Sequence, residues 1–218
     1  HNLILGSTTV VGAGTDWEVD GRSQRRYTPY HIRHRTEVAG MMTILHGDNR
    51  FYNNIFVQYY PVDNNESKES PYYQVVGNHV WDEYPTYDEW IARFDMDVEK
   101  PDMDKLAVPH FDHLPVWANG NAYLMGAKAW KKETDKFVDA DTEVTVELVE
   151  KDAFYELETN IYEILGDYSN GIITSDILGK AFEPEQRFEE RDESDIIFNV
   201  DFYGNHRGVS TIPGPLAK

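Results

Sequence analysis

The chain has 218 residues, of which 39 are Asp or Glu and 20 are Lys or Arg, so its formal net charge at pH 7 is -19. This acidic balance argues against binding to nucleic acid or to anionic membrane surfaces, and it is compatible with a neutral substrate such as a sugar. The absence of cysteine excludes disulfides and thiolate catalysis. No apolar run approaches the roughly 20 residues of a membrane span, while 40% hydrophobic and 13% aromatic residues suffice for a folded core.

Short apolar or β-branched runs, each bounded by Gly, Asn or Asp, predict β-strands in the first quarter of the chain. The predicted strands are 3–5, 8–12, 41–45 and 51–57, and the last of them contains an Asn-Asn pair. Short strands broken by glycine and asparagine corners, without helices between them, are typical of a right-handed parallel β-helix. We therefore expect asparagines to stack at the corners and to hydrogen-bond between neighbouring coils.

Between the second and third predicted strands lies a loop that is unusually rich in cationic side chains. The loop begins after Asp16 and ends before Glu37. Its cationic or titratable side chains are Arg22, Arg25, Arg26, His31, Arg33, His34 and Arg35. In so acidic a protein these side chains either pair with surface carboxylates or line a site. A β-helix coil commonly takes somewhat over 20 residues, so positions 21 apart would project from one face about 4.7–4.9 Å apart. Two carboxyl groups about 5–5.5 Å apart suit a retaining glycosidase, and about 6.5–9.5 Å suits an inverting one.

The next part of the chain, over about residues 59–113, predicts an insertion of loops and one short surface helix. Thr86 and Glu89 form a capping-box pattern at the start of that helix. The acidic run 95–104 lacks the glycine and the terminal glutamate of an EF-hand, and the HxxH pair in His110 to His113 lacks a third ligand. We expect neither segment to bind a metal ion.

The second half of the chain predicts a return to β structure. An Asn-Gly-Asn corner at 119–121 indicates that the β scaffold resumes there, close to Trp117, which either belongs to the scaffold or stacks on a sugar ring. Alternating apolar residues over 142–165, with a Lys-Asp corner at 151–152, predict an antiparallel hairpin. A final strand is predicted over 196–202.

Four segments of the chain resemble glycoside hydrolase family 120, a family of retaining β-xylosidases built on a right-handed parallel β-helix. They are GSTTVVGAGTDWE, RYTPYHIRHRTEVAGMMTILHGDNRFYNNIFVQ, LGKAFEPEQRFE and FNVDFYGNHRG. Members of the family are considerably longer than this chain. The resemblance therefore implies that residues 1–218 form the C-terminal part of an all-β catalytic domain, with the upstream part on a separate chain or in a missing segment. We further expect a homo-oligomer in the cytoplasm.

The resemblance also implies roles for individual residues. The family uses an aspartate nucleophile and a glutamate acid/base slightly more than one coil later, and these roles fall on Asp16 and Glu37. Trp17, His34 and Arg35 are then expected to bind the sugar, with Trp17 stacked beneath it and His34 hydrogen-bonded to a hydroxyl. This chemistry needs no cofactor.

Two different environments would hold the two carboxyl groups in the protonation states that this chemistry needs. The loop arginines would keep Asp16 ionised, and the apolar neighbours Val38, Ala39 and Met41 would raise the pKa of Glu37. The resulting hypothesis is a retaining exo-β-xylosidase that releases xylose from short β-1,4-xylo-oligosaccharides. Two alternatives remain open, namely a non-catalytic carbohydrate-binding module on the same β-helix and a polysaccharide lyase whose loop arginines neutralise a uronate.

Overall fold

The computed structural model describes residues 1–8, 10, 16–19, 22–25, 27–32, 34–60, 75–97, 99–107, 112–152, 154–182 and 184–217. Strands dominate its regular structure, so the predicted all-β class is confirmed at that level. The strands are β1 (Leu3–Ile4), β2 (Asp16–Val19), β3 (Arg22–Arg25), β4 (Tyr27–His31), β5 (Val38–Thr43), β6 (Asn49–Tyr52), β7 (Ile55–Val57), β8 (Val116–Asn119), β9 (Asn121–Leu124), β10 (Lys136–Asp139), β11 (Val146–Glu150), β12 (Tyr155–Thr159), β13 (Asn170–Gly171) and β14 (Ser210–Thr211). The helices are short: η2 (Asn78–Trp81), α1 (Tyr87–Ile91), η3 (Ala92–Phe94), α2 (Met103–Ala107), α3 (Ile161–Leu165) and α4 (Ser175–Leu178).

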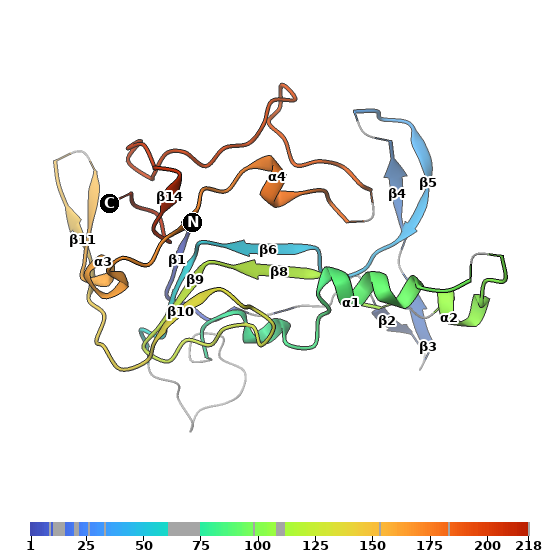
Figure 1. Ribbon diagram of the computed structural model, residues 1–218, viewed down its shortest axis with the longest axis horizontal. Helices are drawn as coiled ribbons and strands as arrows, with labels where there is room; N and C mark the ends of the chain where they lie inside the picture. The colour runs from blue at the N-terminus through green and yellow to red at the C-terminus, as the bar shows by residue number, and fades with distance from the viewer. Residues whose placement is uncertain are drawn as a thin grey trace.

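Parallel strands from distant parts of the chain are stacked at the centre of the molecule (Figure 1). One sheet has the order β1-β7-β9-β10 with every neighbouring pair parallel, and β6 pairs parallel with β8. The segment β6-corner-β7 therefore lies on the segment β8-corner-β9. The predicted continuous strand 51–57 is wrong, because the Asn-Asn pair at 53–54 forms a corner between β6 and β7. Gly120 turns the second corner at φ 70°, where a Cβ would lie 2.4 Å from Asn53 Oδ1, so only glycine fits between the two layers.

A ladder of side-chain amides runs across the stacked strands, and the sequence-based expectation of asparagine stacking is confirmed. Asn2 Nδ2 donates to Asn54 Oδ1 at 2.9 Å, and Asn54 Nδ2 donates to Asn121 Oδ1 at 3.0 Å. Asn121 Nδ2 then donates to Glu133 Oε1 at 2.7 Å, and the other carboxyl oxygen accepts the Tyr123 hydroxyl at 2.5 Å. Asn121 is fully buried, so these hydrogen bonds replace water in the interior.

Both faces of the parallel sheet are covered by apolar side chains. On one face Ile55 and Leu124 belong to a cluster with Ile161 and Leu165, which α3 supplies. On the other face the rings of Phe56 and Tyr123 stack with centroids 5.1 Å apart and join a second cluster. Burial on both faces explains why β7 is an uninterrupted apolar run rather than an alternating one.

The peripheral elements agree in part with the sequence-based predictions. Thr86 and Glu89 form the predicted capping box of α1, which lies within the predicted insertion range. The hairpin β11-β12 is antiparallel, as predicted, but it ends at Thr159, and residues 161–165 of the predicted range form α3. The predicted strand 196–202 is wrong: the described residues there form only isolated bridges, from Ile197 to Thr174 and from Val200 to His206, because no described strand lies alongside to extend either bridge into a ladder.

Candidate functional site

Two antiparallel hairpins hold the residues that the sequence singled out. Asp16 begins β2, which pairs with β3 so that Asp16 lies opposite Arg25, and the side chains of Asp16 and Trp17 lie outside the described part of the structure. Glu37 directly precedes β5, which pairs with β4. The predicted parallel register between Asp16 and Glu37 is therefore wrong for these strands. The described strands β2, β3, β4 and β5 form two local hairpins instead, because antiparallel pairing between neighbouring segments satisfies their backbone groups.

Arg35 and Glu37 form a bidentate ion pair at the end of the β4-β5 hairpin. Arg35 Nη2 donates to Glu37 Oε1 at 2.6 Å, and Arg35 Nε donates to Glu37 Oε2 at 3.3 Å. The hydrogen bond from Arg35 lowers the pKa of Glu37. The expectation that apolar neighbours raise this pKa is wrong, because Val38 and Met41 are 58% and 60% exposed and remove little water from the carboxylate.

His34 lies in the same loop and contacts a distant segment of the chain. Its Nε2 lies 2.7 Å from Glu189 Oε1, and its Nδ1 lies 3.8 Å from Glu193 Oε1. His34 has φ 55°, in the left-handed region that the tight loop imposes. The structure thus brings His34, Arg35 and Glu37 together, with His34 and Arg35 each facing a carboxylate. The sequence-based analysis missed Glu189, although the resemblance includes it at the end of LGKAFEPEQRFE.

Arg50 is a second residue that the sequence-based analysis missed. Its guanidinium carbon lies 4.1 Å from the ring centroid of Trp117 and 4.5 Å from that of Phe188, so the cation is held between two aromatic faces. Arg50 also donates to the carbonyl oxygens of Leu178 at 2.7 Å and of Lys180 at 2.5 Å. The face of Trp117 that meets Arg50 thus packs within the scaffold, one of the two roles foreseen for this residue.

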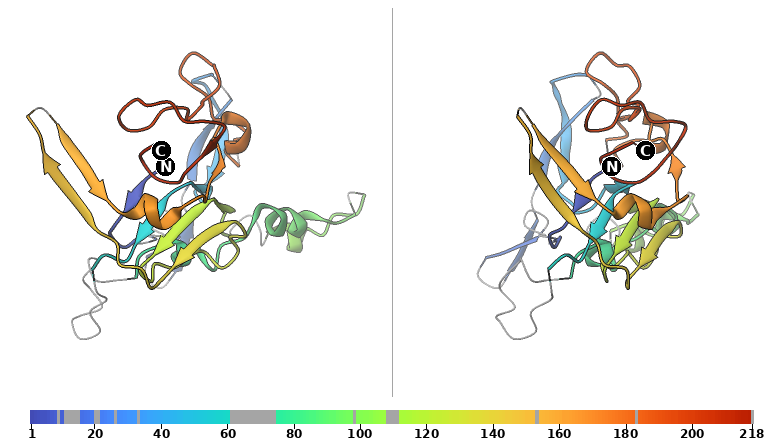
Figure 2. Two further views of the ribbon diagram at one scale, coloured as in Figure 1. Left: turned by 60° about the vertical axis from the view of Figure 1, so that its left-hand side comes forward. Right: turned by 90° about the vertical axis from the view of Figure 1, so that its left-hand side faces the viewer.

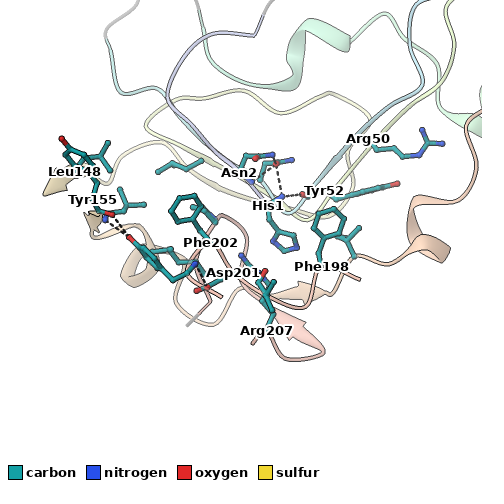
Figure 3. A pocket seen from close by; sticks show the side chains of 18 of the residues that line it. His1, Asn2, Arg50, Tyr52, Leu148, Tyr155, Phe198, Asp201, Phe202 and Arg207 are labelled. Atoms are coloured by element: carbon teal, nitrogen blue, oxygen red, sulfur yellow. Dashed lines mark hydrogen bonds between the residues drawn. The ribbon is translucent and has the colours of Figure 1, made fainter. Parts of the chain in front are cut away.

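A separate cavity of about 980 Å³ lies between the start of the chain, the β11-β12 hairpin and residues 198–216 (Figure 3). Its lining is largely apolar and includes Leu148, Phe198 and Phe202, with Asp201 and Arg207 at one side. The described candidate residues His34, Arg35 and Glu37 do not line it. The larger part of the exposed wall is apolar and favours apolar contacts, although His1, Asn2, Arg50 and Asn54 also line it.

Neither a metal centre nor a membrane span is found in the part of the chain that the structure describes. No three His, Asp or Glu side chains there converge on a common point that a metal ion could occupy. His110 lies outside the described residues, whereas the His113 ring stacks on Tyr84 at 4.2 Å and Asp112 pairs with Arg93. None of the described helices has the length and apolar character needed to cross a bilayer.

Comparison with known proteins gives one informative similarity. No family model matches the chain, and no curated protein matches it. Among solved structures, the complex of XylC with xylose is similar, with a TM-score of 0.73 and 24% sequence identity. The similarity covers 99% of this chain but only 30% of the XylC chain. At this level of identity the similarity shows that this chain has the fold of the corresponding part of XylC.

Proposed function

We propose that this chain is part of a β-xylosidase of the kind found in glycoside hydrolase family 120. The observation that carries the proposal is the match of almost the whole chain to XylC, a protein whose structure was determined with xylose. The family resemblance of the segments around Asp16, Glu37 and Glu189 supports it independently. The strongly acidic composition is compatible with an uncharged sugar substrate.

The proposal includes a right-handed parallel β-helix as the scaffold. Its support is the parallel pairing of β6 with β8 and of β7 with β9 on either side of a tight corner. Asn54 and Asn121 lie at equivalent places in the two layers, and their side chains are hydrogen-bonded to each other. Stacked corners joined by asparagine amides suit coils that lie one strand spacing apart.

The proposed reaction is a double displacement with Asp16 as nucleophile and Glu37 as acid/base. The Asp16 carboxylate would attack the anomeric carbon while the glycosidic C–O bond breaks, and Glu37 would give its proton to the departing oxygen. Water would then give a proton to Glu37 and attack the same carbon, so that the xylosyl ester to Asp16 breaks and xylose leaves with its configuration retained. Since Arg35 favours the ionised form of Glu37, their ion pair must open before Glu37 can donate a proton.

Within this proposal the described residues form only part of the active enzyme. The chain spans 30% of the length of the XylC chain, and we propose that further polypeptide supplies the remaining sugar-binding residues. The apolar cavity beside Leu148 and Phe202 would suit contact with that polypeptide better than contact with xylose. Association of identical subunits is also part of the proposal and can be measured by light scattering of the intact protein.

Release of 4-nitrophenol from its β-xyloside by the intact protein tests the proposal. Glu37→Gln should lower turnover of natural xylo-oligosaccharides by orders of magnitude, whereas Glu190→Gln, which changes an exposed glutamate, should not. Azide should restore turnover of an activated xyloside in the Glu37→Ala variant and give the β-azide. Binding of xylose without any hydrolysis would favour the carbohydrate-binding module, and products that absorb in the ultraviolet would favour the lyase.

A further inference from the structure

The loop at the end of the β4-β5 hairpin, called here the 32–37 loop and described at residues 32 and 34–37, is held against a segment more than 150 residues later in the chain. β4 and β5 form a two-stranded sheet, and neither of them pairs with any other described strand. Figures 1 and 2 show the hairpin standing beside the segment that follows α4. The side chain of Tyr27 is 54% exposed and that of Met41 is 60% exposed, so the hairpin gains little from apolar burial at these positions.

The contact between His34 and Glu189 joins this loop to that segment. The two side-chain atoms lie 2.7 Å apart, and the Glu189 side chain is only 9% exposed, whereas the His34 side chain is 45% exposed. A carboxylate that is mostly removed from water needs hydrogen-bond donors, and an imidazole N–H is one of them. Glu193 lies farther from the ring, at 3.8 Å, and its side chain is 64% exposed. Among the described residues of the loop, Arg35 and Glu37 are the other charged groups, and they are paired with each other.

The segment that carries Glu189 is itself attached to the parallel sheet. Arg50, at 7% side-chain exposure in β6, donates to the carbonyl oxygens of Leu178 and Lys180 and lies against the ring of Phe188. Phe188 directly precedes Glu189 in the chain. A continuous set of contacts therefore runs from β6 through Arg50 to Glu189, and then to the loop three residues before Glu37.

We propose that Glu189 is a positioning residue that holds the 32–37 loop, and with it Glu37, at a defined place above the sheet. Its effect on catalysis depends on the proposed function, because it acts through Glu37. Its effect on the loop does not depend on that function. An acid/base residue must reach the glycosidic oxygen within hydrogen-bond distance, so a loop that moves by an ångström loses turnover more than substrate binding.

Amide hydrogen exchange in the intact protein tests the structural part of the proposal. Glu189→Ala should increase the exchange rates of the amides in the 32–37 loop about tenfold, the change expected when a hydrogen bond to a charged group is lost. Glu193→Ala is the matched control, because it removes a neighbouring carboxylate at the longer distance, and it should leave these rates unchanged. Unchanged exchange in Glu189→Ala would overturn the proposal.

A second variant approaches the contact from the other side and guards against general unfolding of the first. His34→Asn keeps a residue that tolerates positive φ but removes the ring nitrogen that reaches Glu189. It should also raise exchange in the loop, and the double variant should show less than the combined effect of the two single changes, because the two changes remove a shared interaction. Additive effects of the two changes would contradict a direct contact.

The catalytic part is tested separately with the β-xyloside. Glu189→Ala should lower kcat about tenfold or more with little change in KM, whereas a purely structural role would lower the amount of folded enzyme and leave kcat per folded molecule unchanged. Faster exchange in the loop with unchanged kcat would overturn positioning of Glu37 by Glu189. Absence of hydrolysis by the unmodified protein would instead overturn the proposed function, and the exchange measurement would still decide whether Glu189 holds the loop.

Discussion

The amide ladder makes a quantitative prediction about stability. Asn121→Ala removes four side-chain hydrogen bonds from a fully buried position: two accepted from Asn54, one donated to Phe51 and one donated to Glu133. Each intramolecular hydrogen bond contributes about 0.5–1.5 kcal/mol, and the partners left without water or protein contacts add to the loss. We expect the free energy of unfolding to fall by roughly 4 kcal/mol, a large part of the stability of a typical domain.

Urea unfolding of the intact protein, followed by far-ultraviolet circular dichroism, measures this loss. For a slope of about 1–3 kcal/mol per M of urea, the midpoint should fall by roughly 2 M. Asn199→Ala is the matched control, because Asn199 is exposed, and it should change stability by less than about 0.5 kcal/mol. A loss below about 1 kcal/mol in Asn121→Ala would refute the reasoning, because it would mean that water or neighbouring groups satisfy the partners of Asn121.

Three further predictions follow from single sites. Burial raises the pKa of Glu133 above 4.5, so the folded state binds the proton of Glu133 more tightly than the unfolded state does. The stability that this proton contributes is therefore lost as pH rises from 4.5. Glu133→Gln should weaken this pH dependence of the free energy of unfolding in urea titrations. Gly77→Ala should lower the thermal midpoint more than Gly126→Ala, because both have positive φ but only the first Cβ meets a carbonyl oxygen at 2.1 Å. Because Arg35 lowers the pKa of Glu37, Arg35→Gln should raise it and move the high-pH limb of kcat/KM upward, as a pH-rate profile would show.

The parts of the fold that could be predicted are those in which local sequence and final environment agree. The capping box at Thr86 and the hairpin around 151–152 both satisfy their backbone groups with residues close in the chain. The stacking of asparagines also followed from residue type, because a side-chain amide has both a donor and an acceptor and can continue a ladder without a break.

The pairing of the stacked parallel strands could not be predicted, because segments of different length separate them in the chain. Between stacked strands the offset is 52 residues from Leu3 to Ile55, 67 from Ile55 to Ala122 and only 15 from Asn121 to Lys136. The assumption of a constant spacing of about 21 residues therefore does not hold for these stacked strands. No periodicity in the sequence distinguishes a coil from a pair of local hairpins when both use short polar strands.

The ionised form of Glu37, which Arg35 favours, bears on how the proposed enzyme would work. An exposed carboxylate paired with arginine is suited to be a base, whereas the first step of the proposed reaction needs an acid at the same place. Removing water from the carboxylate and separating it from Arg35 would both raise its pKa, and a sugar bound over the 32–37 loop would do the first of these. The arginine could then turn toward a sugar hydroxyl, which would reconcile its predicted role in substrate binding with its present contact. On this reasoning the ion pair belongs to the free enzyme, and substrate binding itself would prepare Glu37 to donate its proton.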